Sequence, residues 1–279
     1  AKIALSINKL TKTYQSKKGQ VEALKAVEFS IEKGEVFGLL GPNGAGKSTL
    51  INILAGVTDQ TSGTAAIDGI DISDDHTLAK RKIGIVPQEI GFDVFFSVGD
   101  AMKLQYGYYG LPFDETHSDS ILEKLSLLNK KDTKPRELSG GMQRRFMIAK
   151  ALVHKPKVLI LDEPTAGVDV ELRHDLYDLV RELNADGITI VLTSHYLEEV
   201  ELLCDRVAII RKGELIALDH KDELKKRFST DRQLHLKLEK TIKDIPASLN
   251  DFKPELSKKT LKLTFAEDAY NKVLAAVTK

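Results

Sequence analysis

The amino-acid sequence predicts an α/β protein whose core is a doubly wound, mostly parallel β-sheet. Four short apolar runs have the composition of strands that are buried on both faces. Stretches with helical periodicity lie between these runs, and strands that alternate with helices favour a parallel sheet covered on both sides. The four runs are Ile83 to Val86, Val158 to Leu161, Ile188 to Thr193 and Val207 to Ile210.

We expect an N-terminal antiparallel β subdomain before this core. Residues Ile3 to Lys9 and Val21 to Ile31 alternate apolar and polar side chains, which predicts two strands joined by a polar turn that ends at Gly19. A short apolar run, Glu35 to Leu40, follows and stops at a glycine-rich loop. A helix is then expected from about Lys47 to Ala55.

An α-helical subdomain is expected to be inserted into the core, over about residues 89–155. This stretch is mostly helical in pattern and contains no convincing strand. Together with the strands on both sides, it belongs to a main domain that we assign to residues 1–228.

Residues 229–279 predict a small α+β C-terminal appendage. Residues 234–238 and 261–265 alternate apolar and polar side chains, and residues 266–277 follow helical spacing. Three elements are too few to bury a good core alone. We therefore expect this β-β-α appendage to dock on the main domain or on a second copy of the chain, either as a regulatory part or as a domain cut short.

The composition argues against a membrane-spanning chain. Hydrophobic residues make up 42% and charged residues 29% of the 279 residues, as in soluble globular proteins. The aliphatic stretches are much shorter than the roughly 20 residues of a membrane-spanning helix. The N-terminal segment also lacks the apolar centre of a signal peptide. We expect the chain not to cross a bilayer and to remain in the compartment where it is made.

The charge balance and the cysteine content indicate which partners and which compartment to expect. Lys plus Arg and Asp plus Glu balance at 41 each, which argues against nonspecific nucleic-acid binding, because affinity for a phosphate backbone needs excess positive charge. The single cysteine, Cys204, cannot form an intramolecular disulfide, which fits a reducing compartment. Free cysteines are usually buried, so we expect Cys204 to be a small core residue on a helix.

A phosphate-binding loop is the first motif that carries chemistry. Residues Gly41 to Ser48, GPNGAGKS, fit the pattern G-x-x-x-x-G-K-[ST] between a strand and a helix. The glycines let successive N–H groups point at phosphate oxygens, and the following helix adds its positive end. Lys47 supplies a full charge to the β- and γ-phosphates, and the Ser48 hydroxyl can ligate Mg²⁺. This placement favours a P-loop NTPase core over a flexible glycine-rich turn.

Two carboxylates at a strand end are the expected partners of this loop. The run Val158 to Leu161 leads into Asp162 and Glu163, at the carboxyl edge of the sheet where such folds bind ligands. Asp162 would hold Mg²⁺ directly or through water, and Glu163 would polarise the attacking water. An ordinary strand-to-loop junction is the alternative, but a phosphate loop already demands a metal-binding partner.

Residues Leu138 to Arg145, LSGGMQRR, resemble the signature sequence of ATP-binding-cassette (ABC) proteins. They precede the strand with the two carboxylates, as in that family. Gln88, residues 166–169 and His195 resemble three further motifs in the family's order. The resemblance covers at least residues 5–220.

The resemblance also implies how two subunits share a site. In this family two subunits pack head to tail, and Ser139-Gly140-Gly141 of one covers the γ-phosphate held by Lys47 of the other. Here this segment opens an expected helix from about Met142 to Val153, so it offers free N–H groups, a hydroxyl and a positive dipole end. Met142 stands where the family usually has glutamine.

The site residues that the resemblance implies form three sets. The catalytic set is Glu163 as general base with His195, Gln88 and Lys47, and the Mg²⁺ set is Ser48, Gln88 and Asp162. Tyr14 resembles the aromatic residue that stacks on adenine, with a half-buried strand tyrosine as its alternative, and Asp169 resembles the residue that crosses the dimer interface. The ATP-binding set is Tyr14, Asn43, Gly44, Ala45, Gly46, Lys47, Ser48, Thr49, Ser139, Gly140, Gly141, Met142 and Asp169.

Six aromatic residues after Gln88 form a further candidate surface. In the family, the groove that docks a permease lies between this glutamine and the helical subdomain. Packing within the subdomain core is the alternative for each of them. The six are Phe92, Phe95, Phe96, Tyr106, Tyr108 and Tyr109.

Residues 38–43, residues 195–199 and the chain length are most like bacterial exporters of drugs, polysaccharides or lipids. The resemblance implies an ATP-hydrolysing subunit that acts as a homodimer or heterodimer on a separate transmembrane permease. It would lie on the cytoplasmic face of the inner membrane and bind no nucleic acid. The alternative is a non-transport ABC ATPase acting on ribosomes or chromosomes. Those usually carry two cassettes or a long coiled-coil insertion, whereas about 90 residues separate Lys47 from Ser139 here.

Overall fold

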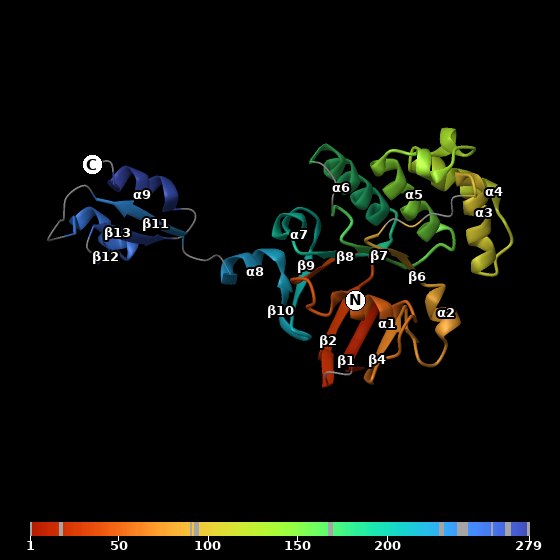
Figure 1. Ribbon diagram of the computed structural model, residues 1–279, viewed down its shortest axis with the longest axis horizontal. Helices are drawn as coiled ribbons and strands as arrows, with labels where there is room; N and C mark the ends of the chain where they lie inside the picture. The colour runs from red at the N-terminus through yellow and green to blue at the C-terminus, as the bar shows by residue number, and fades with distance from the viewer. Residues whose placement is uncertain are drawn as a thin grey trace. The chain divides into compact units, whose positions relative to one another are not determined.

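The computed structural model describes most of the 279-residue chain, in two compact units, Ala1–Lys221 and Asp222–Lys279 (Figure 1). The predicted domain boundary at residue 228 and the boundary between the compact units fall at opposite ends of one helix, α8 (Lys221–Phe228). The described residues are 2–16, 19–89, 91, 95–166, 170–228, 232–238, 245–257, 259–265 and 269–277.

An antiparallel sheet begins the main unit, with the strand order β2-β1-β4-β5. The first strand runs past its predicted end at Lys9, so that prediction was wrong. Lys9 has a φ of 46°, and the pairing register with β2 shifts between Ile7 and Leu10. Such a bulge interrupts the apolar-polar alternation while the strand continues. The strands are β1 (Ile3–Ser16), β2 (Gly19–Glu32), β4 (Ser62–Ile67) and β5 (Ile70–Asp71).

The predicted core strands pair in a second sheet, with the order β10-β9-β3-β8-β7-β6. β3 pairs in parallel with β8 and β9, and β7 pairs in parallel with β6 and β8. β10, which the sequence analysis missed, is antiparallel to β9. The carboxyl ends of β3, β8 and β7 therefore lie side by side. The strands are β3 (Val36–Leu40), β6 (Ile83–Val86), β7 (Val158–Asp162), β8 (Thr189–Ser194), β9 (Arg206–Arg211) and β10 (Glu214–His220).

Between β6 and β7 the described residues form helices and no strand, as the sequence predicted. Three helices, α3, α4 and α5, gather beside β6 in Figure 1. No helix in the described ranges is both long and apolar enough to span a bilayer. The helices of the main unit are α1 (Lys47–Leu54), α2 (His76–Lys80), α3 (Val98–Tyr108), α4 (Glu115–Lys124), η1 (Leu128–Lys130), η2 (Pro135–Glu137), α5 (Gly140–Leu152), α6 (Val170–Ala185) and α7 (Leu197–Leu203).

One hydrophobic cluster joins the two sheets of the main unit. Four apolar side chains of α1 are buried in it, together with side chains from β1, β2, β3 and β7. Phe29 of β2 and Phe37 of β3 stack within it, with their ring centres 5.3 Å apart. Because α1 begins at Lys47, burial of this helix fixes Lys47 and Ser48, the last two residues of the phosphate loop.

The second unit has a small core of its own. It contains the predicted two strands and helix, and adds a short third strand and a 3₁₀ helix. The sheet order is β11-β13-β12, with both pairs antiparallel. The elements are β11 (Arg232–Lys237), η3 (Ala247–Phe252), β12 (Glu255–Ser257), β13 (Thr260–Phe265) and α9 (Tyr270–Val277). The core is built from Leu249, Leu261, Leu263, Phe265 and Val273.

Gly38 in the middle of β3 lets α7 approach the sheet closely. A Cβ atom added at Gly38 would lie 3.0 Å from Cys204 Sγ and 3.2 Å from Val200 Cγ1. We expect Gly38→Ala to lower the free energy of unfolding by about 1–3 kcal/mol, the usual cost of overpacking. In a Cys204→Ala background the same change should cost less, because the sulfur atom is gone. Urea unfolding of the four variants measures this, and equal costs in both backgrounds would contradict the contact.

Candidate functional site

The predicted phosphate loop joins the carboxyl end of β3 to the first turn of α1. Gly46, the N-cap residue of α1, has a φ of 113°, and a Cβ atom there would lie 2.6 Å from the carbonyl oxygen of Ala23. Glycine is therefore required at this position by both conformation and space. Lys47 follows as the first helical residue and is buried.

Distant segments hold this loop through backbone hydrogen bonds. The N–H of Gly213, in the turn between β9 and β10, donates to the Ala45 carbonyl at 2.8 Å. The Gly213 carbonyl in turn accepts from the N–H of Lys25 on β2 at 2.8 Å, and the N–H of Gly41 donates to Ser194 at the end of β8 at 3.3 Å. The loop is thus fixed to both sheets of the main unit.

A cavity of about 610 Å³ lies over the loop, within the size range of small-molecule sites. It brings together the predicted loop residues with Gln88 and Glu163. It also includes residues of β2 and Lys212, which the sequence analysis missed because only long-range folding places them here. The lining residues are Gln20, Val21, Glu22, Ala23, Lys25, Pro42, Asn43, Gly44, Ala45, Gly46, Lys47, Ser48, Thr49, Gln88, Glu163, Lys212 and Gly213.

The buried carboxylate of Glu163 lies between the side chains of Lys47, the first residue of α1, and His195, which follows β8. Its Oε1 is 3.5 Å from Lys47 Nζ, and its Oε2 is 3.2 Å from His195 Nδ1. Lys47 Nζ also donates to the Gly41 carbonyl at 2.5 Å. Glu163 is 7% exposed and has a left-handed φ of 44°, an uncommon conformation for a non-glycine residue that favours a functional position. The structure therefore groups three of the four predicted catalytic residues.

Thr193 on β8 organises both carboxylates. Its hydroxyl donates to Asp162 Oδ1 at 2.5 Å and accepts from the N–H of Glu163 at 2.9 Å. Burial raises the pKa of Asp162 above its ordinary value, and the bond from Thr193 partly opposes this. The sequence alone does not mark Thr193 as functional, since a threonine in an apolar strand looks like any other β-branched residue.

Glu199 on α7 supports the segment that carries His195. The Ser194 hydroxyl donates to Glu199 Oε2 at 2.5 Å and accepts from the N–H of Tyr196 at 2.9 Å. Glu199 is 2% exposed, and its Oε1 is buried without a hydrogen-bond partner. Burial raises the pKa of this carboxyl above its ordinary value of 4.5. Glu199 thus fixes Ser194 directly and Tyr196 through Ser194, so both neighbours of His195 in the chain are held in place.

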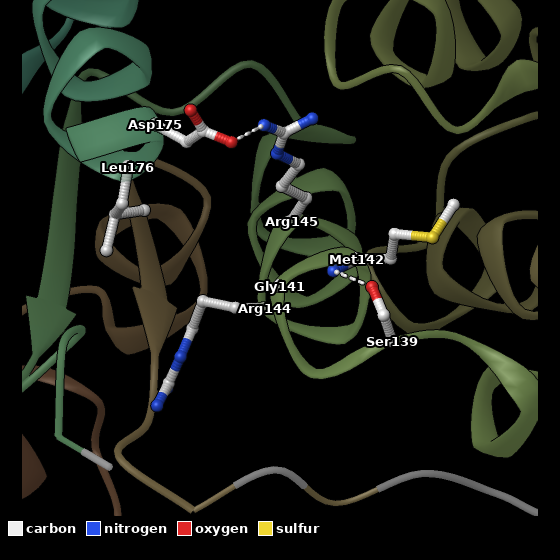
Figure 2. Close-up of a pocket in the computed structure, with 7 residues that line it drawn as sticks. All are labelled: Ser139, Gly141, Met142, Arg144, Arg145, Asp175 and Leu176. Atoms are coloured by element: carbon white, nitrogen blue, oxygen red, sulfur yellow. Dashed lines mark hydrogen bonds and ion pairs between the residues drawn. The ribbon is translucent and has the colours of Figure 1, made fainter. Parts of the chain in front are cut away.

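The predicted signature segment lies at a second location. Ser139 caps α5, and its hydroxyl accepts from the N–H of Met142 at 3.4 Å (Figure 2). None of its residues lines the phosphate cavity, and Gly140 is the first residue of α5. A separate cavity of about 200 Å³ is lined by Ser139, Gly141, Met142, Arg144, Arg145, Asp175 and Leu176.

Two further predicted residues lie outside this grouping. Tyr14 lies on β1 opposite Val21, is exposed, and has Lys12 Nζ 4.9 Å from its ring centre. It does not line the cavity, although its cross-strand neighbour Val21 does. Asp169 falls outside the described residues.

A phosphate loop after a parallel strand, two acids at the end of a second parallel strand and a helical insertion define an ATP-binding cassette of the P-loop NTPase class. The sequence profile of the ABC transporter family matches residues 24–166. The chain belongs to the ABC transporter family. It is an ATP-binding subunit of that family and an ATPase, as the sequence analysis predicted.

Similar proteins extend this assignment. The linearmycin resistance ATP-binding protein LnrL of Bacillus subtilis is 43% identical over 220 residues, which cover 78% of this chain and 71% of LnrL. The Nod factor export ATP-binding protein I of Burkholderia lata is 41% identical, over 71% of this chain and 66% of that protein, so the match spans slightly less than two thirds of it. The dimeric structure of MJ0796, a bacterial ABC transporter cassette, matches with a TM-score of 0.69 and 29% identity, over 78% of this chain and 98% of that one.

The buried Glu199 predicts a pH dependence of stability. Because its folded-state pKa is raised, its favourable contribution is fully present below its unfolded value of 4.5 and is lost as pH rises through the folded-state pKa. We expect Glu199→Gln, which stays neutral, to lose less unfolding free energy than the parent chain between pH 4.5 and pH 8. Urea unfolding across this range measures the difference. Exposed Glu198→Gln on the same helix is the control, and parallel curves for Glu199→Gln and the parent would contradict the argument.

Proposed function

We propose that this chain is the motor subunit of an exporter, which hydrolyses MgATP and works as a head-to-tail dimer on a separate transmembrane permease. The observation that carries the proposal is the buried Glu163 carboxylate, which contacts both Lys47 and His195 beside a cavity lined by the phosphate loop. A carboxylate in that position can accept a proton from water as the water attacks a phosphoryl group.

The proposed Mg²⁺ ligands suit that ion in their chemistry. Ser48 and Gln88 line the phosphate cavity, and Asp162 lies at the adjoining strand end. All three offer oxygen atoms, which Mg²⁺ prefers. No group of three His, Cys, Asp or Glu side chains among the described residues could hold a metal alone, so phosphate oxygens and water would complete the shell. When bound, the ion neutralises charge on the phosphates.

Each catalytic side chain then has a distinct task. Lys47, which donates to the Gly41 carbonyl and forms an ion pair with Glu163, binds the β- and γ-phosphates. Glu163 orients the attacking water and accepts its proton. His195 contacts the Glu163 carboxylate and holds the water and γ-phosphate in place. Thr193 and Glu199 keep these groups aligned through the bonds described above.

The proposed dimer is supported by the separate locations of the phosphate loop and the signature segment at the start of α5. Ser139, Gly140, Gly141 and Met142 begin α5 away from the phosphate cavity of their own chain. The N-terminus of a 13-residue helix favours an anion, and a second copy packed head to tail would supply one. The structure of MJ0796, a bacterial ABC transporter cassette, is dimeric, which supports a dimer of this chain as well. Tyr14 as the adenine platform and Asp169 as an interface residue are parts of this proposal.

The aromatic residues after Gln88 divide into core and surface. Tyr106 is buried, and Tyr109 stacks on His154 with ring centres 3.8 Å apart. Phe95 and Tyr108 are 82% and 73% exposed. Tyr108 and Phe96 line a small cavity of about 60 Å³ with residues of α3 and α5. We assign the permease contact to Phe95, Phe96 and Tyr108, and Phe92 lies outside the described residues.

The names of the relatives support the exporter branch, and a location at the membrane goes with that role. The Nod factor proteins are export ATP-binding proteins, and LnrL is a resistance protein. We therefore propose a peripheral position on the cytoplasmic face of the membrane, with the ATP-binding cassette domain in residues 1–228 and the appendage in residues 229–279.

Glu163→Gln tests the general-base role. We expect ATP binding to persist while turnover falls at least about 100-fold, because Gln cannot accept the proton, and the chain should accumulate as an ATP-bound dimer. Steady-state ATPase assays, nucleotide binding and light scattering measure these effects. Glu115→Gln, at an exposed site on α4, is the matched control. Wild-type turnover in Glu163→Gln would remove the general base from the proposal.

Cysteine crosslinking tests the permease contact. The native Cys204 is buried, and burial raises its pKa to about 12, so it will not interfere. We expect Phe95→Cys and Tyr108→Cys to crosslink to a polytopic membrane protein in native membranes. Val57→Cys, equally exposed but after α1, should not. Crosslinking from Val57→Cys alone, or to soluble proteins only, would contradict the assigned surface.

A further inference from the structure

Arg144 joins α5 to the end of β6. Its Nη1 donates to the carbonyl oxygens of Pro87 and Gln88, at 3.0 and 3.1 Å. These two residues directly follow β6, and Gln88 is one of the residues that line the phosphate cavity. In Figure 2 the Arg144 side chain leaves the helix in a different direction from Arg145, whose Nη2 pairs with Asp175 of α6 at 3.2 Å. One buried guanidinium thus holds the backbone that carries Gln88.

Stability alone does not explain an arginine at this position. Arg144 is 5% exposed, makes no ion pair among the described residues, and its Nε is buried without a hydrogen-bond partner. Burial lowers its pKa, and the nearby Asp162 only partly opposes this. Burying a charge without a paired carboxylate is costly, and an apolar side chain of similar volume is often at least as stable. The fold therefore carries a cost that calls for a functional reason.

Arg144 links two parts of the chain that have proposed roles in ATP binding: the N-terminus of α5 and the backbone of Pro87 and Gln88. Ser139 caps α5 five residues before Arg144, about 7.5 Å away along the helix axis. A helix of this length moves as a rigid element, so a displacement of its N-terminus also displaces the guanidinium. The carbonyl groups of Pro87 and Gln88 would follow, because both accept from the same nitrogen.

We propose that Arg144 is a positioning residue that couples the N-terminus of α5 to Gln88. When the N-terminus of α5 engages the nucleotide of a second copy, Arg144 sets the Gln88 side chain in its own phosphate cavity. Dimer formation and the placement of Gln88 as a metal ligand therefore occur together. The inference rests on the proposed function, which assigns Gln88 to the metal and Ser139 to the partner's nucleotide.

The test uses the full chain with a non-hydrolysable ATP analogue, and Mn²⁺ as a spectroscopic substitute for Mg²⁺. Electron paramagnetic resonance measures Mn²⁺ affinity at low and high protein concentration, where the monomer and the dimer dominate. We expect the parent chain to bind Mn²⁺ about tenfold more tightly as a dimer. Arg144→Met should fold, bind the analogue, and lose this difference. Arg144→Lys, which keeps a donor, should restore part of it.

Two controls separate the possible failures. Arg145→Met removes a neighbouring charge but no contact to Gln88, and it should keep the parent's dimer effect. If Arg144→Met keeps that effect as well, or if the parent shows none, the coupling is overturned. Gln88→Ala should weaken Mn²⁺ binding in the dimer. If it does not, the role of Gln88 has failed and this proposal falls with it, while the Glu163→Gln experiment still tests hydrolysis independently.

Discussion

Leu40, Ser194 and Asp162 end three neighbouring strands at one edge of the six-stranded sheet, because β8 pairs in parallel with both β3 and β7. The phosphate loop, the two acids and His195 each follow one of these three ends, and Gln88 follows the end of β6, which pairs in parallel with β7. The phosphate loop continues from β3, the two acids terminate and follow β7, and His195 follows β8. Antiparallel pairing of β8 would send its end to the opposite edge, and the contact between His195 and Glu163 could not form. The chemistry therefore depends on strand direction before it depends on any side chain.

At this edge of the sheet, the oppositely charged side chains of Lys47 and Glu163 lie close together and are shielded from solvent. Lys47 and Glu163 are both buried, and each has a further polar partner, so neither charge is isolated. The opposite charge and the polar partners offset part of the cost of burying each group. The left-handed backbone of Glu163 turns its carboxylate back toward the phosphate loop, and the Thr193 hydroxyl fixes that turn. Backbone strain at one residue is thus held by a hydrogen bond from the neighbouring strand.

The sequence predicted the parts of this site that are local in the chain. A phosphate loop is a continuous pattern, and the acids come directly after an apolar run, so Lys47 and Glu163 could be found without a structure. Thr193, Glu199 and Arg144 could not, because each acts through a partner far away or through burial that no local pattern reveals. The bulge at Lys9 hid half of β1 for a related reason: one residue in an unusual conformation interrupts a period-two pattern. Lys212 and the β2 residues line the cavity because the turn at Gly213 bonds to both Ala45 of the loop and Lys25 of β2, and these bonds form only in the folded chain.

The junction of Ala45 with Gly213 also bears on how the protein is made. The turn that holds the phosphate loop is contributed by residues far downstream of it, between β9 and β10. A chain emerges from the ribosome from its N-terminus onward, so the loop is synthesised long before the turn that fixes it. The nascent chain completes its nucleotide pocket only when residue 213 has emerged. By then every strand of the six-stranded sheet except β10 has been synthesised.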